Sequence, residues 1–170
     1  ENEEMYAKFK KLGNSKQEIS PLIAEHIDIA NILRRSAKNW DGGYTIAGLL
    51  GHGDAFVLRD PAGIRPAYYY KDDEVVVVAS ERPAIQTAFN VAIDSIKEVK
   101  PGHALIIKRN GKITEEKIKE PTQRLSCSFE RIYFSRGSDL DIYAERKELG
   151  RLLCQQTLQA VDYDLRNTVI

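Results

Sequence analysis

Side chains that could act as nucleophiles or metal ligands are few in this sequence and lie far apart. The two cysteines, Cys127 and Cys154, are 27 residues apart, and neither has a histidine or second cysteine nearby in sequence that would activate the thiol or share a metal. We therefore expect structural thiols and no metal site. A secreted domain of this size usually carries more cysteines, so this usage favours a reducing, cytoplasmic setting.

Titratable residues at close spacing also favour structural roles. His52 and Asp54 lie two apart in a glycine-flanked turn, where we interpret them as solvated turn groups rather than an acid–base pair. Glu115 and Glu116 are adjacent, so on a strand they point to opposite faces and act as surface charges. His26 falls on an apolar helical stripe and is predicted to be a packed core histidine. With no phosphate-binding glycine loop and no H-E-x-x-H pair, the sequence predicts no self-contained active site.

Composition and charge exclude several partner classes. The 25 lysine and arginine residues balance 25 aspartate and glutamate residues, so no basic field exists that would attract nucleic acid. The longest apolar run, Val75–Ala79, has five residues, whereas a membrane-spanning helix needs about 20. At 170 residues, 42% of them apolar, the chain should form one globular domain or at most two small ones.

The first 40 residues predict helices. Residues 3–12 carry apolar side chains at helical spacing, and a second helix is expected from Ser20 as N-cap, with Pro21 at its first position, to about Asn39. The chain starts at Glu1 without an initiating Met or a signal-peptide pattern, so we expect a cut inside a longer protein.

Residues 44–118 predict an antiparallel sheet structure. The β-branched run Val75–Val78 is apolar at successive positions, which is expected of a strand covered on both faces. Ser80 is predicted to cap a short helix over 81–89. The expected strands are 44–50, 55–59, 67–70, 75–79, 93–99, 104–108 and 112–118.

A polar stretch with Pro121 marks a boundary, which divides the chain into domains of residues 1–119 and 120–170. After it, residues 125–136 are expected to be partly extended and residues 141–163 helical. The apolar stripe of this helix would lack its partner, and residues 167–170 would begin a strand.

Two segments give the sequence a family resemblance. Arg59–Pro66, followed by a strand and Ser80-Glu81, resembles the R-D-x-x-G-x-x-P-L…A-S-E pattern of class II glutamine amidotransferases. Val99–Gly102 and Cys127–Arg136 are similar to the V-x-P-G turn and the C-x-F-E-x-x-Y-F-A-R linker of the amidophosphoribosyltransferase branch. The likeness covers residues 40–154, although Gly137 stands where a proline normally follows the arginine, which indicates a divergent branch.

For the fold, the resemblance implies an α+β class. Residues 1–119 would be the C-terminal half of an N-terminal-nucleophile hydrolase (glutaminase) domain, an αββα four-layer sandwich with antiparallel sheets. Residues 120–170 would be the linker and the first helix and strand that lead into a phosphoribosyltransferase domain. We expect Asp60 and Arg65 to fix the corner by pairing or hydrogen bonding, and Tyr133 and Phe134 to line an ammonia route or to pack between domains. The structural motif comprises Arg59, Asp60, Gly63, Arg65, Pro66, Ser80 and Glu81, and the interdomain linker comprises Cys127, Phe129, Glu130, Tyr133, Phe134 and Arg136.

For function, the resemblance implies a parent enzyme that hydrolyses glutamine through a thioester and passes ammonia to phosphoribosylpyrophosphate in purine nucleotide biosynthesis. The parent would need magnesium with phosphoribosylpyrophosphate, the remainder of the chain as partner, and homo-oligomeric assembly. The family's cysteine nucleophile and glutamine-binding loops belong to the first half of the domain, so this chain is expected to hold no catalytic residue and to be inactive alone. Two cysteines cannot supply the four-cysteine cluster of some family members.

Two alternatives stay open at this point. The chain could be a catalytically dead interaction module that binds a partner through unpaired sheet edges. It could also belong to a class II amidotransferase domain of the asparagine synthetase type.

Overall fold

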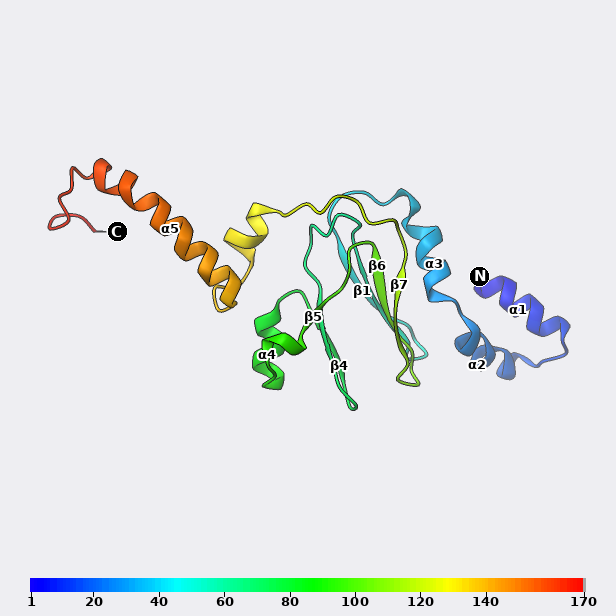
Figure 1. The fold of residues 1–170 in the computed structure, drawn as a ribbon. Helices are drawn as coiled ribbons and strands as arrows, with labels where there is room; N and C mark the ends of the chain where they lie inside the picture. The colour runs from blue at the N-terminus through cyan, green and yellow to red at the C-terminus, as the bar shows by residue number, and fades with distance from the viewer. Residues whose placement is uncertain (170) are drawn as a thin grey trace.

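Two antiparallel sheets form the centre of the computed structural model, which describes residues 1–169 (Figure 1). The first sheet has the order β1-β2-β6-β7, with β1 (Thr45–Leu49), β2 (Ala55–Arg59), β6 (His103–Ile107) and β7 (Ile113–Lys117). The second sheet has the order β4-β3-β5, with β3 (Tyr68–Lys71), β4 (Val76–Ala79) and β5 (Lys97–Glu98). All neighbouring strands are antiparallel, as the sequence predicts.

The alternation of side chains along β2 and β6 builds two separate apolar layers. Val57 lies opposite Leu105, and both pack in the cluster that joins the two sheets. Their neighbours Leu58 and Ala104 also lie opposite each other and point to the other face. Because successive side chains of a strand face opposite ways, one pair of strands supplies both layers.

Helices cover the outer faces of both sheets. Helix α3 (Ile29–Ser36) places Ile29, Ala30 and Leu33 against the outer face of the first sheet. Helix α4 (Arg82–Phe89) contacts β3 and β4 of the second sheet and buries Ile85. The order helix, sheet, sheet, helix confirms the expected αββα four-layer arrangement and the α+β class (Figure 1).

The N-terminal helices differ in part from the prediction. The expected first helix is confirmed as α1 (Asn2–Lys11), but the second begins at Lys16, ahead of Ser20. The Ser15 backbone N–H donates to the Glu18 carboxylate at 2.7 Å, which closes the first turn of α2 (Lys16–His26) five residues earlier than predicted.

The single long helix predicted to reach Asn39 is also wrong. Ile27 has extended backbone angles, and Asp28 then caps a new helix by accepting the Asn31 N–H at 2.9 Å. A 3₁₀ turn, η1 (Ala37–Asn39), completes the segment. His26 is exposed at the end of α2 instead of lying in the core, although its Nδ1 lies 2.9 Å from the Leu22 carbonyl oxygen.

Two further elements required correction in the second sheet. The strand predicted over 93–99 is a 3₁₀ turn, η2 (Ile93–Ser95), followed by the two-residue β5. Helix α4 begins after Glu81, so Ser80 is not its cap. Val75 is 37% exposed, whereas Val76, Val77 and Val78 are half-buried, so both faces of β4 are covered in part.

The C-terminal segment leaves the layered body. Residues 130–134, expected to be extended, form a π-helical turn, η3 (Glu130–Phe134), and α5 (Leu140–Ala160) confirms the predicted helix. Residues 167–169 are not a strand, because Asn167 folds back to donate to Asp164; Ile170 lies outside the described residues. Among residues 1–169, no helix is long and apolar enough to cross a membrane.

Candidate functional site

The corner that follows β2 is built around a buried guanidinium. Arg59 is 2% exposed, and its Nε, Nη1 and Nη2 donate to the carbonyl oxygens of Arg65, Val99 and Gly63 at 2.8, 2.7 and 3.0 Å. Nη1 also lies 2.8 Å from the Glu98 carboxylate. The Arg59 side chain thereby joins the corner to the end of β5, where the chain leaves the second sheet.

The neighbouring carboxylate holds the corner from inside. Asp60 is fully buried, and its oxygens accept the backbone N–H groups of Ala62, Ile64 and Arg65 at 2.9 to 3.1 Å. The expected link between Asp60 and Arg65 therefore runs through the Arg65 backbone. The Arg65 side chain turns away and forms an ion pair with Glu130 at 2.7 Å.

Gly63 is needed at the tip of the corner for two reasons. Its φ of +63° lies in the left-handed region, which favours glycine. A Cβ at this position would also lie 2.9 Å from Cγ of Pro101. The glycine thus allows the corner to approach the turn before β6.

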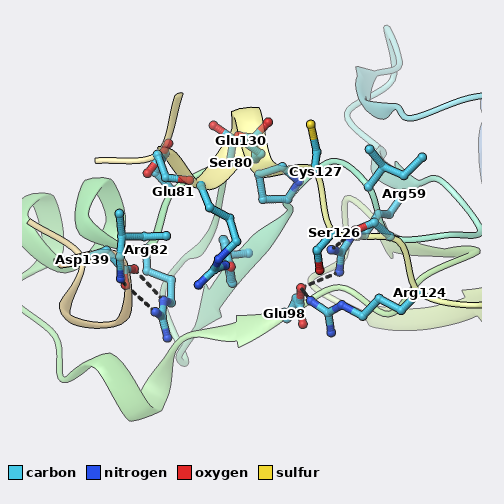
Figure 2. Close-up of a pocket in the computed structure, with 17 residues that line it drawn as sticks. Arg59, Ser80, Glu81, Arg82, Glu98, Arg124, Ser126, Cys127, Glu130 and Asp139 are labelled. Atoms are coloured by element: carbon cyan, nitrogen blue, oxygen red, sulfur yellow. Dashed lines mark hydrogen bonds and ion pairs between the residues drawn. The ribbon is translucent and has the colours of Figure 1, made fainter. Parts of the chain in front are cut away.

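The corner and the linker enclose a small cavity of about 60 Å³ (Figure 2). It brings together residues from three separate predicted segments. Those that line it are Arg59, Gly63, Pro66, Ser80, Glu81, Cys127 and Glu130. Asp60, Arg65, Phe129, Tyr133, Phe134 and Arg136 do not line it, and the Tyr133 side chain is 77% exposed.

Arg82 and Asp139, two residues that sequence reasoning missed, form a bidentate ion pair at this cavity. Arg82 donates from Nε and Nη2 to both oxygens of Asp139, at 2.8 and 2.5 Å (Figure 2). Its Nη2 also donates to Asp141 at 2.6 Å. Burial raises the pKa of Asp139, but the Arg82 contacts outweigh it and the net pKa is lowered. Asp139 and Asp141 in turn raise the pKa of Arg82. Because Arg82 and Asp139 lie 57 positions apart in the sequence, no local pattern indicated this pair.

Further contacts join the linker to its surroundings. The Glu81 carboxylate accepts the Arg136 backbone N–H at 3.1 Å, and the Arg65 guanidinium lies 5.6 Å from the centre of the Phe134 ring. Arg131 of η3 forms an ion pair with Glu145 of α5. The linker is therefore fixed to both the corner and the start of α5.

A second buried cluster corrects the interpretation of His52 and Asp54. Asp54 is 2% exposed; it accepts the Arg109 backbone N–H at 2.8 Å, lies 3.0 Å from His52 Nε2 and forms an ion pair with Lys108. Burial raises the pKa of Asp54, but Lys108, the Arg109 N–H and His52 together lower it to about 2. The interpretation of both residues as solvated turn groups is therefore wrong for Asp54, because Lys108 and the Arg109 backbone bind its buried carboxylate.

The side chains around the cavity between the corner and the linker hold segments of the chain together through hydrogen bonds and ion pairs. Among residues 1–169, no group of three histidine, cysteine or acidic side chains could hold a metal ion, so these residues do not fit a magnesium ion or a four-cysteine cluster. Cys127 is half-buried and Cys154 is exposed, and both are free thiols. The Arg59–Asp60 corner thus contacts both sheets and, through Arg65 and Glu130, the linker.

This geometry agrees with the relationship of the chain to known proteins. The sequence profile of the family described as glutamine amidotransferases class-II matches residues 14–127. The chain therefore belongs to the class II glutamine amidotransferase family.

Within that family the chain is similar to amidophosphoribosyltransferases. It is 33% identical over 152 residues to that of Archaeoglobus fulgidus, covering 86% of this chain and 32% of the relative, and 31% identical over 141 residues to that of Bacillus subtilis, covering 81% and 29%. The structure of the B. subtilis glutamine phosphoribosylpyrophosphate amidotransferase, complexed with ADP and GMP, matches with a TM-score of 0.61 at 28% identity, over 89% of this chain and 35% of that one. The chain thus spans about a third of the length of these relatives.

Proposed function

We propose that this chain is the later part of a glutaminase domain and the linker after it, in an enzyme that transfers glutamine-derived ammonia to phosphoribosylpyrophosphate for purine nucleotide biosynthesis. The observation that carries the proposal is the buried Arg59–Asp60 corner, which stands between both sheets and contacts the linker through Arg65 and Glu130. The relatives described above are all amidophosphoribosyltransferases, which supports phosphoribosylpyrophosphate as the acceptor of ammonia and not the acceptor of an enzyme of the asparagine synthetase type.

In this proposal the described residues act as scaffold, and the catalytic groups come from other segments of the whole protein. Glutamine hydrolysis through a thioester needs an activated thiol. Neither Cys127 nor Cys154 forms a hydrogen bond or ion pair with a histidine among the described residues, which supports a structural role for both thiols. The same proposal places the end of the glutaminase domain near residue 119.

Finer parts of the proposal concern the linker and the surroundings of the enzyme. Tyr133 and Phe134 pack edge to face at 5.4 Å, and both are more than half exposed, which supports a contact with another domain, along an ammonia route or as interdomain packing. We place the magnesium and phosphoribosylpyrophosphate in segments outside this chain. Homo-oligomeric assembly and a cytoplasmic setting remain predictions.

The test compares this chain with the full-length protein from the same reading frame. We expect the 170-residue chain to release no glutamate above the buffer rate. The full-length protein should release glutamate and form pyrophosphate only when glutamine, phosphoribosylpyrophosphate and magnesium are all present. Glutamate release by the short chain that Cys127→Ala abolishes would refute the scaffold role. A full-length protein that hydrolyses glutamine without consuming phosphoribosylpyrophosphate would refute the acceptor, and one without glutaminase activity would favour the interaction module.

A further inference from the structure

Arg82 is held on several sides at the start of α4. Its guanidinium lies 5.7 Å from the centre of the Tyr68 ring of β3, and its nitrogens contact Asp139 and Asp141. The side chain is 21% exposed, so these contacts are partly shielded from water. A bidentate arginine–carboxylate contact fixes direction as well as distance.

Asp139 has two roles in this contact. It is 5% exposed, and besides binding Arg82 it caps α5, with Oδ1 accepting the N–H groups of Asp141 and Ile142 at 3.1 and 3.5 Å. The same carboxylate therefore joins the first residue of α4 to the first turn of α5.

The rest of α5 has little contact with the layered body. Ile142 is 5% exposed, but Leu149, Leu152 and Leu153 are 41%, 60% and 56% exposed. The other side-chain contacts near the start of α5 are made by Glu145 to Arg131 and by Arg146 to backbone oxygens of residues 131 and 135, all in the linker. Among the ion pairs of the described residues of α5 and its cap, only those to Arg82 reach the layered body.

We propose that Arg82 is a clasp that fixes the direction in which α5 leaves the sheets, through its shared contacts with Asp139 and Asp141. Loss of the arginine would leave Asp139 buried without its cation, which weakens the cap and the attachment together. Because Arg82 lies on the surface of the second sheet, the strands of the first sheet keep their contacts. The proposal concerns this chain and does not depend on the proposed reaction.

The direct test measures the distance between spin labels on α4 and α5 of the 170-residue chain. Labels are attached at exposed Cys154 and at Thr87→Cys in α4, with Cys127→Ser to prevent a third label. We expect a narrow distance distribution with Arg82 present and a distribution at least about twofold broader in Arg82→Gln. Arg151→Gln is the matched control, because within residues 1–169 Arg151 pairs only with Glu148 of the same helix, and it should leave the width unchanged.

A second variant separates the ion pair from the helix cap. Asp139→Asn keeps a good capping side chain but removes the charge, so it should broaden the distribution as Arg82→Gln does, and the double variant should be no broader than either single one. Amide exchange over 140–146 should become about tenfold faster in both variants, while exchange over β2 and β6 stays unchanged.

Three outcomes would overturn the proposal. The first is an unchanged width in Arg82→Gln. The second is equal broadening in Arg151→Gln. The third is faster exchange throughout β2 and β6 in Arg82→Gln, because it would make Arg82 a general requirement for folding and not a clasp.

Discussion

At the scale of single residues, the two buried ions of the corner, Arg59 and Asp60, each bind several backbone groups at once. Arg59 binds three carbonyl oxygens and Asp60 accepts three N–H groups, so neither depends on one partner. Burial of a charge is costly unless its hydrogen bonds are satisfied. Substitutions at such positions should therefore affect stability far more than changes to surface charges.

Gly63→Ala is expected to lower the free energy of unfolding by about 2 to 4 kcal/mol, because it adds a contact with Pro101 to the strain of a left-handed backbone. Urea unfolding followed by circular dichroism measures the change. Gly111→Ala is the control: its φ is +83°, and no atom lies within 4 Å of the added Cβ. Gly111→Ala should lower the free energy of unfolding only by the backbone strain, about 1 to 2 kcal/mol. Equal losses in the two variants would show that the approach to Pro101 is unimportant.

The lowered pKa of Asp54 predicts that the free energy of unfolding depends on pH. Its pKa is about 2 in the folded chain against 3.8 in the unfolded chain, so its contribution is complete above pH 3.8 and is lost as pH falls toward 2. Asp54→Asn should lower the free energy of unfolding by about 2 kcal/mol at pH 7. The difference from the unsubstituted chain should shrink on acidification. Urea titrations at several pH values measure it, and a difference that stays constant down to pH 2.5 would contradict the assignment.

At the scale of elements, short sequence patterns predicted the strands and helices whose formation depends on neighbouring residues. The hairpin strands β1 and β2 follow from the turn residues 51–54 between two short strand-like segments, a signal that acts over a few positions. The prediction of one continuous second helix was wrong, because its apolar stripe includes Ile27, whose extended backbone ends α2. The contact of Arg82 with Asp139 joins segments far apart in sequence, which no local pattern encodes.

The cap of α3 gives a test at this scale. Asp28→Ala removes the acceptor for the Asn31 N–H, and we expect a loss of about 1 kcal/mol in the free energy of unfolding. Asp73→Ala, at an exposed aspartate in the turn between β3 and β4, removes the same charge and should change it by less than about 0.5 kcal/mol. Thermal unfolding of the two variants side by side distinguishes the cap from a general charge effect.

At the scale of the whole molecule, the layered body and α5 differ in how far their apolar side chains are covered. Leu105 between the sheets is 1% exposed, whereas the leucines of the outer part of α5 are exposed. Figure 1 shows α5 extending away from both sheets. Apolar side chains that remain in water contribute little to folding of the single chain.

The same substitution at two leucines measures this difference. Leu105→Ala should lower the free energy of unfolding by about 2 to 5 kcal/mol. Leu152→Ala, at a side chain that is 60% exposed, should change it by less than about 0.5 kcal/mol. Both values come from urea unfolding of dilute protein. A large loss at Leu152 would mean that α5 is covered in solution, and sedimentation at two concentrations would then show self-association.

The corner after β2 also has a consequence for how the chain can vary in length. The chain leaves the first sheet at Asp60 and returns at Gly102, and the Gly102 N–H donates to the Asp60 carbonyl oxygen at 3.0 Å, while Arg59 binds the oxygen of Val99. Residues 60–102, which contain the whole second sheet, therefore form a loop whose two ends are joined by these hydrogen bonds. Because closure entropy grows only slowly with loop length, each residue inserted in the turn between β3 and β4 should add well under ~1 kcal/mol of closure entropy. The hydrogen bonds from Asp72 to Glu74 and Val75 would be lost in addition.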